Sequence, residues 1–217
     1  MALQVVTVFV VAVVRARSGS GSVDELMQSA GTDGTFVSLC TFVTTLFCCG
    51  LIALVVALKK GSVLKDYLAL KLVPRNTFLA WLVAILFFAA ASDALTASLG
   101  RPIVPPFMQM AYATAHPVWM LWIAVLVGAP IFEETFFRGF LYKGFAATPL
   151  RPAGAVVLLS ALWASIHLQY GLYEIGIIFA MGLLIGAARI QTGSITVPIA
   201  MHSLASLVAT IEAAMLR

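Results

Sequence analysis

Long apolar runs, separated by short polar stretches, make up most of the chain. An α-helix needs roughly 20 apolar residues to cross the hydrocarbon core of a bilayer. Apolar runs of about that length recur from residue 36 to the C-terminus. The pattern predicts an all-α, polytopic transmembrane helical bundle of about six to seven spans. The expected spans are Phe36–Leu58, Thr77–Leu99, Pro117–Tyr142, Ala153–Gln169, Tyr173–Ala188 and Ser194–Leu216.

The segments between these runs give the domain organisation. Met1–Val14 is apolar but short, and its basic residues follow the apolar run, which is not the order of a signal peptide. It remains either a first span or an interfacial segment. Gly61–Asn76 is basic and is expected along the membrane surface, and Ile103–His116 is expected to lack a regular helix because prolines crowd it. Residues 1–217 form one integral membrane domain, with 1–35 as a variable N-terminal segment.

Composition supports the same class. Hydrophobic residues make up 62% of the 217 positions and charged residues 10%, whereas soluble domains are nearer half apolar and about a quarter charged. The net charge of +4 comes from basic residues in loops, so it indicates membrane topology and not a nucleic-acid partner. The positive-inside rule places the Lys59–Arg75 loop in the cytoplasm. The composition, rich in Ala and Gly, suggests a bacterial cytoplasmic membrane.

Five ionisable side chains lie well inside the apolar runs of the C-terminal half, away from the ends where Glu174 and Glu212 are expected to be solvated. They are Glu133, Glu134, Arg138, His167 and His202. A charged group within a span costs at least about 2.5 kcal/mol, so each is a functional hypothesis by default. They come from three predicted helices at similar depth, and we expect them to face one another because lipid would not accommodate them.

Spacing suggests distinct roles for the two glutamates. Glu134 and Arg138 are four residues apart, with the acid nearer the N-terminus, which favours an ion pair on one helical face. Glu133 points elsewhere and can meet His167 and a water molecule, while His202 can donate to a developing oxyanion. A structural ion pair and hydrogen-bonded packing histidines remain the alternatives for the individual residues.

Three blocks of this sequence resemble the CPBP family, which comprises CAAX proteases and bacteriocin-processing or immunity proteins, including abortive-infection proteins. The first block, Ala129–Tyr142, is similar to the family's EExxxR signature. The second, Ser160–His167, places an aromatic residue four positions before a histidine, although it is Trp163 where the family usually has Phe. The third block is Gly182–His202. The resemblance covers about Trp119–Ser206, within a family-like core of about 117–210.

The resemblance implies a glutamate-dependent intramembrane endopeptidase. It implies that Glu133 and His167 activate water, that Glu134 and Arg138 organise the site, and that His202 forms an oxyanion hole with the residue four positions later. That residue is usually Asn in the family and is Ser206 here. The implied partners are the lipid bilayer and a peptide or protein substrate, lipidated or membrane-anchored.

Three alternatives stay open. A non-hydrolytic membrane immunity or scaffold protein would retain the same fold, and Ser206 is the feature that favours it. A zinc site is conceivable from two His and two Glu, but the HExxH spacing is absent, and no cofactor is expected. A proton-coupled transporter is disfavoured because no inverted repeat is evident.

Overall fold

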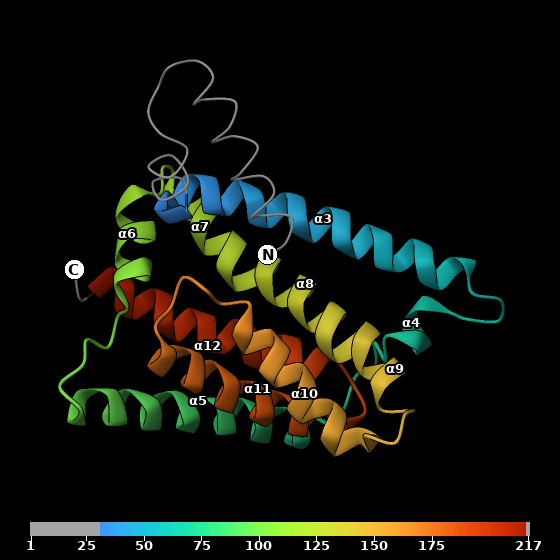
Figure 1. Cartoon of the computed structure of the whole chain (residues 1–217). Coiled ribbons are helices and arrows are strands. Elements are labelled where there is room, and N and C mark those ends of the chain that lie inside the picture. Colours follow the sequence, from blue (N-terminus) through green and yellow to red (C-terminus); the bar gives the residue numbers. More distant parts are fainter. Residues whose placement is uncertain (1–30, 216–217) are drawn as a thin grey trace, which may run out of the picture.

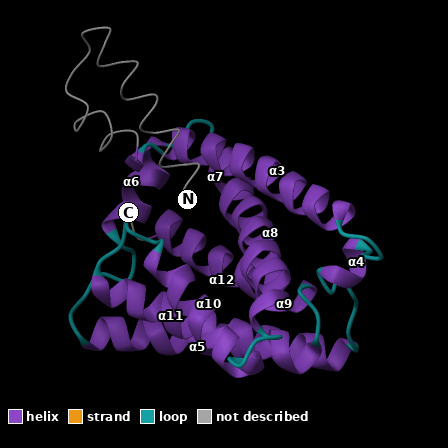
Figure 2. Cartoon of the chain, turned by 45° about the vertical axis from the view of Figure 1, so that its right-hand side comes forward, coloured by secondary structure: helices purple, strands orange, loops and turns teal. Residues whose placement is uncertain are grey.

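The computed structural model describes residues 31–215, and all regular elements in this range are helices (Figure 2). The all-α prediction is therefore confirmed. The elements are α3 (Gly34–Leu58), α4 (Leu64–Tyr67), α5 (Arg75–Ser98), α6 (Pro106–Thr114), α7 (Val118–Ile123), the π-helical segment η1 (Ala124–Gly128), α8 (Ala129–Glu134), the π-helical segment η2 (Thr135–Leu141), α9 (Tyr142–Phe145), α10 (Arg151–Ser165), α11 (Leu172–Thr192) and α12 (Thr196–Met215).

Five helices in the described range are long and apolar enough to cross a membrane: α3, α5, the continuous helix Val118–Phe145, α11 and α12. The protein is thus an integral membrane protein. The expected seventh candidate, Met1–Val14, lies outside the described residues. In Figure 1, α3 covers one side of the Val118–Phe145 helix, α10, α11 and α12 lie on its other side, and α5 is outermost.

The fourth expected span is shorter than the sequence suggested. Ala153–Gln169 was predicted to be helical throughout, but α10 ends at Ser165, so the last four residues of that range are a turn. A helix of 15 residues rises about 22 Å, less than the ~30 Å of a hydrocarbon core. Its short length brings the turn that carries His167 to the depth of the other candidate residues.

A second correction concerns the proline-rich linker. Ile103–His116 was expected to lack a regular helix, yet α6 occupies Pro106–Thr114. The prolines lie at the beginning of this helix, where a fixed φ is favourable and the missing N–H would have no helical partner. Proline content therefore marked the start of α6 rather than the absence of a helix.

The Val118–Phe145 helix contains two π-helical segments, Ala124–Gly128 and Thr135–Leu141. Pro130 follows the first of them and lacks the N–H that would bond four residues back, so a widened turn relieves the clash of its ring with the preceding turn. The second begins directly after Glu134 and contains Arg138. Such widened turns frequently lie at functional sites.

Two glycines let α11 approach α10 closely. A Cβ atom at Gly186 would lie 2.3 Å from a methyl carbon of Val156, and one at Gly182 would lie 3.0–3.1 Å from atoms of Ser160 and Trp163. Neither position has room for a side chain without movement of its neighbours. The close approach brings the backbone of α11 next to Trp163.

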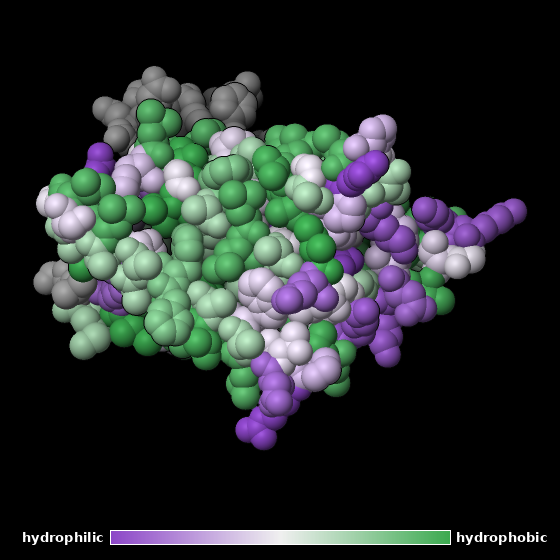
Figure 3. Space-filling view, turned by 90° about the horizontal axis from the view of Figure 1, so that it is seen from below, coloured by the Kyte–Doolittle hydropathy of each residue, from purple (hydrophilic) through white to green (hydrophobic). Residues whose placement is uncertain are grey.

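The surface has the distribution expected of a protein in lipid. Large apolar side chains such as Leu46, Phe47 and Phe87 are exposed on α3 and α5, which would be unfavourable in water. Seen from below in Figure 3, hydrophilic residues gather at the end that carries α4 and α9, and apolar residues cover much of the rest of that face. Lys59, Lys65 and Lys143 belong to the hydrophilic end.

Candidate active site

The carboxylate of Glu134 lies at the centre of an ionic cluster buried inside the bundle. Glu134 is fully buried, and its Oε1 accepts a hydrogen bond of 3.3 Å from Nη1 of Arg138. Nδ1 of His202 lies 3.0 Å from the same oxygen. The other terminal nitrogen of Arg138 donates to the carbonyl oxygen of Gly182 at 3.3 Å. One carboxylate therefore joins the Val118–Phe145 helix to α12, while its arginine partner reaches α11.

Glu133, the neighbouring acid, has a different environment. It is half-buried, and its Oε2 accepts a hydrogen bond of 2.5 Å from the indole Nε1 of Trp163 in α10. Within the described residues, Oε1 of Glu133 makes no hydrogen bond. The two acids thus differ. Glu134 is fixed by Arg138, as the spacing predicted, and by His202, and its Oε2 is buried without a hydrogen bond in the described range. Glu133 is half-buried and keeps Oε1 available for a ligand.

The hydrogen bond that His167 makes to the backbone defines its tautomer. Its Nδ1 lies 2.7 Å from the carbonyl oxygen of Trp163. A carbonyl oxygen only accepts, so Nδ1 carries the hydrogen, and the neutral ring has its lone pair on Nε2. His167 lies in the turn after α10, outside the membrane-spanning helices, and burial lowers its pKa, while nearby Glu133 acts in the opposite direction. The ring is therefore a neutral base at physiological pH.

Trp163 brings the separate groups together. It is fully buried, and its ring meets those of His167 and His202 edge-on, with centroids 5.2 Å and 5.3 Å away. The guanidinium of Arg138 lies over the indole, 4.5 Å from the centroid, in a cation–π arrangement. Of the five residues singled out in the sequence, four contact this indole directly: Glu133, Arg138, His167 and His202. Glu134 is linked to it through Arg138.

Several partners could not be read from the sequence. The structure adds the Trp163 N–H on Glu133, the Glu134–His202 contact and the carbonyl of Gly182. It also buries Arg189, whose Nε donates to the carbonyl oxygen of Arg138 at 2.9 Å. Arg189 lies in the last turn of α11, where a basic residue is common, so the sequence pattern did not single it out. The π-helical turn explains why the carbonyl of Arg138 is open to this side chain.

Ser206, the residue expected to assist His202, lies one turn further along α12. It is half-buried, and its backbone carbonyl accepts a hydrogen bond from Thr210. Its hydroxyl makes no hydrogen bond within residues 31–215. The role expected for Ser206 beside His202 stays a prediction.

The arrangement of the His and Glu side chains of the site also bears on metal binding. Residues 31–215 contain no group of three or more His, Cys, Asp or Glu side chains arranged to hold one. One nitrogen of each histidine is already engaged, by the Trp163 carbonyl and by Glu134. A tetrahedral zinc site needs three or four converging ligands, and these residues do not provide that arrangement.

Comparison with known proteins confirms the resemblance drawn from the motifs. Residues 114–208 match the family model described as Type II CAAX prenyl endopeptidase Rce1-like. An uncharacterized 24.3 kDa protein of Escherichia coli is 28% identical over 133 residues, which cover 59% of this chain and 61% of that relative. No solved structure matches the chain. The match contains all seven residues of the predicted site.

Proposed function

We propose that this chain, whose residues 114–208 match the Type II CAAX prenyl endopeptidase Rce1-like family, hydrolyses peptide bonds with a water molecule activated by Glu133 and His167. The observation that carries the proposal is the convergence of Glu133, His167 and His202 around Trp163. The proposed site is the bacterial cytoplasmic membrane, and the proposed substrate is a peptide or protein segment held there.

The first chemical step uses the free oxygen of Glu133 and Nε2 of His167. A water molecule between them loses a proton to one of these bases as its oxygen attacks the carbonyl carbon of the scissile peptide bond. Trp163 holds the other carboxylate oxygen and thereby fixes the direction of the free one. Burial favours the neutral form of His167, which is the form that can accept a proton.

The tetrahedral oxyanion needs a hydrogen-bond donor, and His202 is the candidate. Its Nδ1 faces the carboxylate of Glu134. A neutral ring that donates from Nδ1 to Glu134 has a lone pair and no hydrogen on Nε2, so it cannot donate to the oxyanion. With hydrogen on both nitrogens, the ring would donate to Glu134 from Nδ1 and to the oxyanion from Nε2. Ser206 would contribute a second hydrogen bond. Collapse of the intermediate breaks the C–N bond, and the amine leaves with the proton taken from water.

A cleavage assay of Glu133→Gln against wild type tests the proposal. The protein is reconstituted in nanodiscs and incubated with two fluorogenic membrane peptides, one of them prenylated. We expect wild-type turnover and at least a hundredfold loss in Glu133→Gln, because an amide cannot accept the proton. Asp66→Asn, which also replaces a carboxylate with an amide but at an exposed position of α4, is the matched control and should retain full activity.

The non-hydrolytic immunity or scaffold protein is the second candidate, and Ser206 in place of the family's usual Asn favours it. Equal turnover by wild type and Glu133→Gln would contradict the proposed mechanism. Absence of turnover by wild type on both peptides would favour the scaffold.

A further inference from the structure

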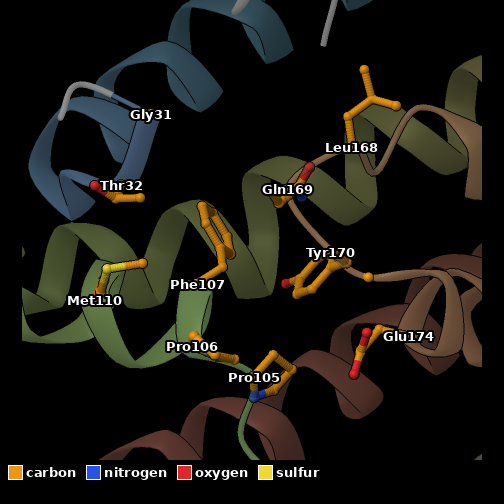
Figure 4. Close-up of a pocket in the computed structure, with 11 residues that line it drawn as sticks. Gly31, Thr32, Pro105, Pro106, Phe107, Met110, Leu168, Gln169, Tyr170 and Glu174 are labelled. Carbon is orange, nitrogen blue, oxygen red and sulfur yellow. The ribbon is translucent and has the colours of Figure 1, made fainter. Parts of the chain in front are cut away.

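The end of the bundle that carries α4 and α9 has an excess of positive charge. Residues 59–75 contain five basic residues and one acid, Asp66, and α9 adds Lys143 to the same end. The opposite end differs: within the described range, the residues around the pocket shown in Figure 4 include neither lysine nor arginine. An anionic partner is therefore expected at the end formed by α4 and α9.

Two of these cations share one aromatic ring. Nζ of Lys143 lies 4.2 Å from the centroid of the Tyr67 ring, and Nζ of Lys59 lies 5.2 Å from it. Both lysines are exposed, and within residues 31–215 neither ammonium group forms an ion pair. Because like charges repel, two ammonium groups held at one ring favour the binding of an anion beside them.

The fold builds this site from three separate elements. Lys59 follows the last residue of α3, Tyr67 ends α4, and Lys143 lies in α9. The ring of Tyr67 packs against that of Phe140, with centroids 6.0 Å apart. The next residue, Leu68, is buried in the apolar core. The ring that holds the two lysines is therefore fixed from the interior of the bundle.

The loop around Tyr67 has the character of a segment in the lipid headgroup layer. Leu58, Val63 and Leu72 are exposed between the basic residues. Such a mixture of apolar and basic side chains lies at a membrane interface, where each kind has a suitable environment. Lys59 directly follows the membrane-spanning α3, so its ammonium group is placed at the level of the phospholipid headgroups. A lipid phosphate therefore fits this site better than an acidic soluble protein.

We infer that Lys59, Lys143 and Tyr67 bind the phosphodiester headgroup of an anionic phospholipid. The phosphate oxygens accept charge-assisted hydrogen bonds from the two ammonium groups, and the acyl chains lie against neighbouring apolar side chains such as Leu58. By the positive-inside rule the lipid belongs to the cytoplasmic leaflet, whose anionic lipids attract basic segments next to a span. This site is distinct from the buried residues proposed for hydrolysis.

Native mass spectrometry of the full-length protein tests the site. Wild type in detergent is titrated with phosphatidylglycerol and, separately, with phosphatidylcholine of the same acyl chains, and the Kd of the first bound lipid is measured. We expect phosphatidylglycerol to bind at least about fivefold more tightly, the contribution of one lysine near a lipid surface. Lys59→Gln combined with Lys143→Gln should weaken phosphatidylglycerol binding roughly 5- to 25-fold and leave phosphatidylcholine binding unchanged.

A matched double variant separates the site from general attraction to the basic end. Lys60→Gln combined with Lys65→Gln also removes two exposed charges from this end, but neither lysine lies over the Tyr67 ring. This variant should bind phosphatidylglycerol nearly as wild type does. Equal losses in the two double variants would overturn the site.

Two substitutions of the aromatic residue test the ring itself. Tyr67→Phe keeps the ring and should bind phosphatidylglycerol as wild type does, whereas Tyr67→Leu should bind it more weakly. Thermal midpoints measured without lipid separate a loss of binding from a loss of folding. A folded Tyr67→Leu protein with wild-type affinity would contradict the role of the ring.

The remaining measurements identify the source of the phosphate. Equal affinities of wild type for phosphatidylglycerol and phosphatidylcholine would overturn the assignment. Glycerol phosphate carries the same phosphate without acyl chains, and an equimolar amount should not displace the bound lipid. Displacement would show a site for a free phosphate and would also overturn the assignment. Turnover enters none of these measurements, so they are decisive even if the hydrolytic proposal fails.

Discussion

The indole N–H of Trp163 donates to Oε2 of Glu133, joining the middle of the Val118–Phe145 helix to α10. The backbone carbonyl oxygen of Trp163 in turn accepts a hydrogen bond from Nδ1 of His167. One residue therefore orients both groups proposed to activate water, the acid through its side chain and the imidazole through its backbone. Positioning of this kind increases reactivity because the reacting groups are already aligned.

Trp163→Phe tests this relationship. Phenylalanine keeps an aromatic ring beside His167 but removes the N–H that holds Glu133. A hydrogen bond to a charged group is worth about 1.5–3 kcal/mol, so we expect kcat to fall roughly 10- to 100-fold. Trp122→Phe, which loses an indole hydrogen bond to the hydroxyl of Tyr112 away from the site, is the control. Equal activities of the two variants would contradict the positioning role.

The two adjacent glutamates should respond differently to the same substitution. Glu133 is half-buried with one hydrogen-bond donor, and a glutamine there can still accept from Trp163. Glu134 is fully buried between Arg138 and His202, and Glu134→Gln leaves the arginine without its counter-charge. Breaking a buried pair costs about 3–5 kcal/mol.

We therefore expect Glu133→Gln to be inactive with an unchanged thermal midpoint, and Glu134→Gln to melt several degrees lower. Thermal unfolding in detergent, followed by circular dichroism, provides the comparison. A larger loss of stability in Glu133→Gln than in Glu134→Gln would reverse the proposed roles.

The sequence predicted most of the helices, and it predicted that the buried ionisable side chains lie together, because both follow from simple constraints. Apolar run length indicates membrane spans, and buried charges must meet one another, so Glu134 and Arg138 were correctly paired. The end of α10 was predicted wrongly because Ile166–Gln169 has the same composition as a continuing helix. Only the packing around His167 distinguishes a turn there.

The remaining contacts depend on backbone geometry that composition does not reveal. The π-helical segment after Glu134 changes which carbonyls are free, and this lets Arg189 reach the oxygen of Arg138. Likewise, the missing side chain of Gly182 leaves room for the Trp163 ring that donates to Glu133. These are relationships between helices, whereas the sequence pattern informs mainly about each helix by itself.

The pH dependence of turnover should report the state of His167. Burial lowers the pKa of this imidazole, and nearby Glu133 opposes the change only in part. A base must be unprotonated, so activity is present above this pKa and lost as pH falls through it. The acidic limb of the kcat/KM profile should therefore have its midpoint below the ordinary histidine value of about 6.5. A midpoint clearly above that value would contradict the assignment, and His167→Gln should abolish the limb.

Chelation tests the metal-independent mechanism. The engaged histidine nitrogens and the absence of a three-donor group within residues 31–215 do not fit a tetrahedral ion. Turnover should therefore be unchanged after prolonged incubation with 1,10-phenanthroline, compared with a non-chelating isomer. Loss of activity that added zinc restores would show that the site rearranges around a metal.

Ser206 is the position where a substitution should increase the proposed activity. It lies one turn after His202 on α12, and its hydroxyl has no hydrogen-bond partner in the described range. An asparagine amide reaches further and supplies two N–H donors, so it can hold an oxyanion that a serine reaches poorly. We expect Ser206→Asn to raise kcat roughly tenfold, on the order of one further hydrogen bond to charge. Ser206→Ala should lower kcat, and leave KM unchanged, because the oxyanion exists only in the transition state. A Ser206→Asn protein that folds normally but cleaves no faster than Ser206→Ala would show that this turn of α12 does not face the reacting carbonyl.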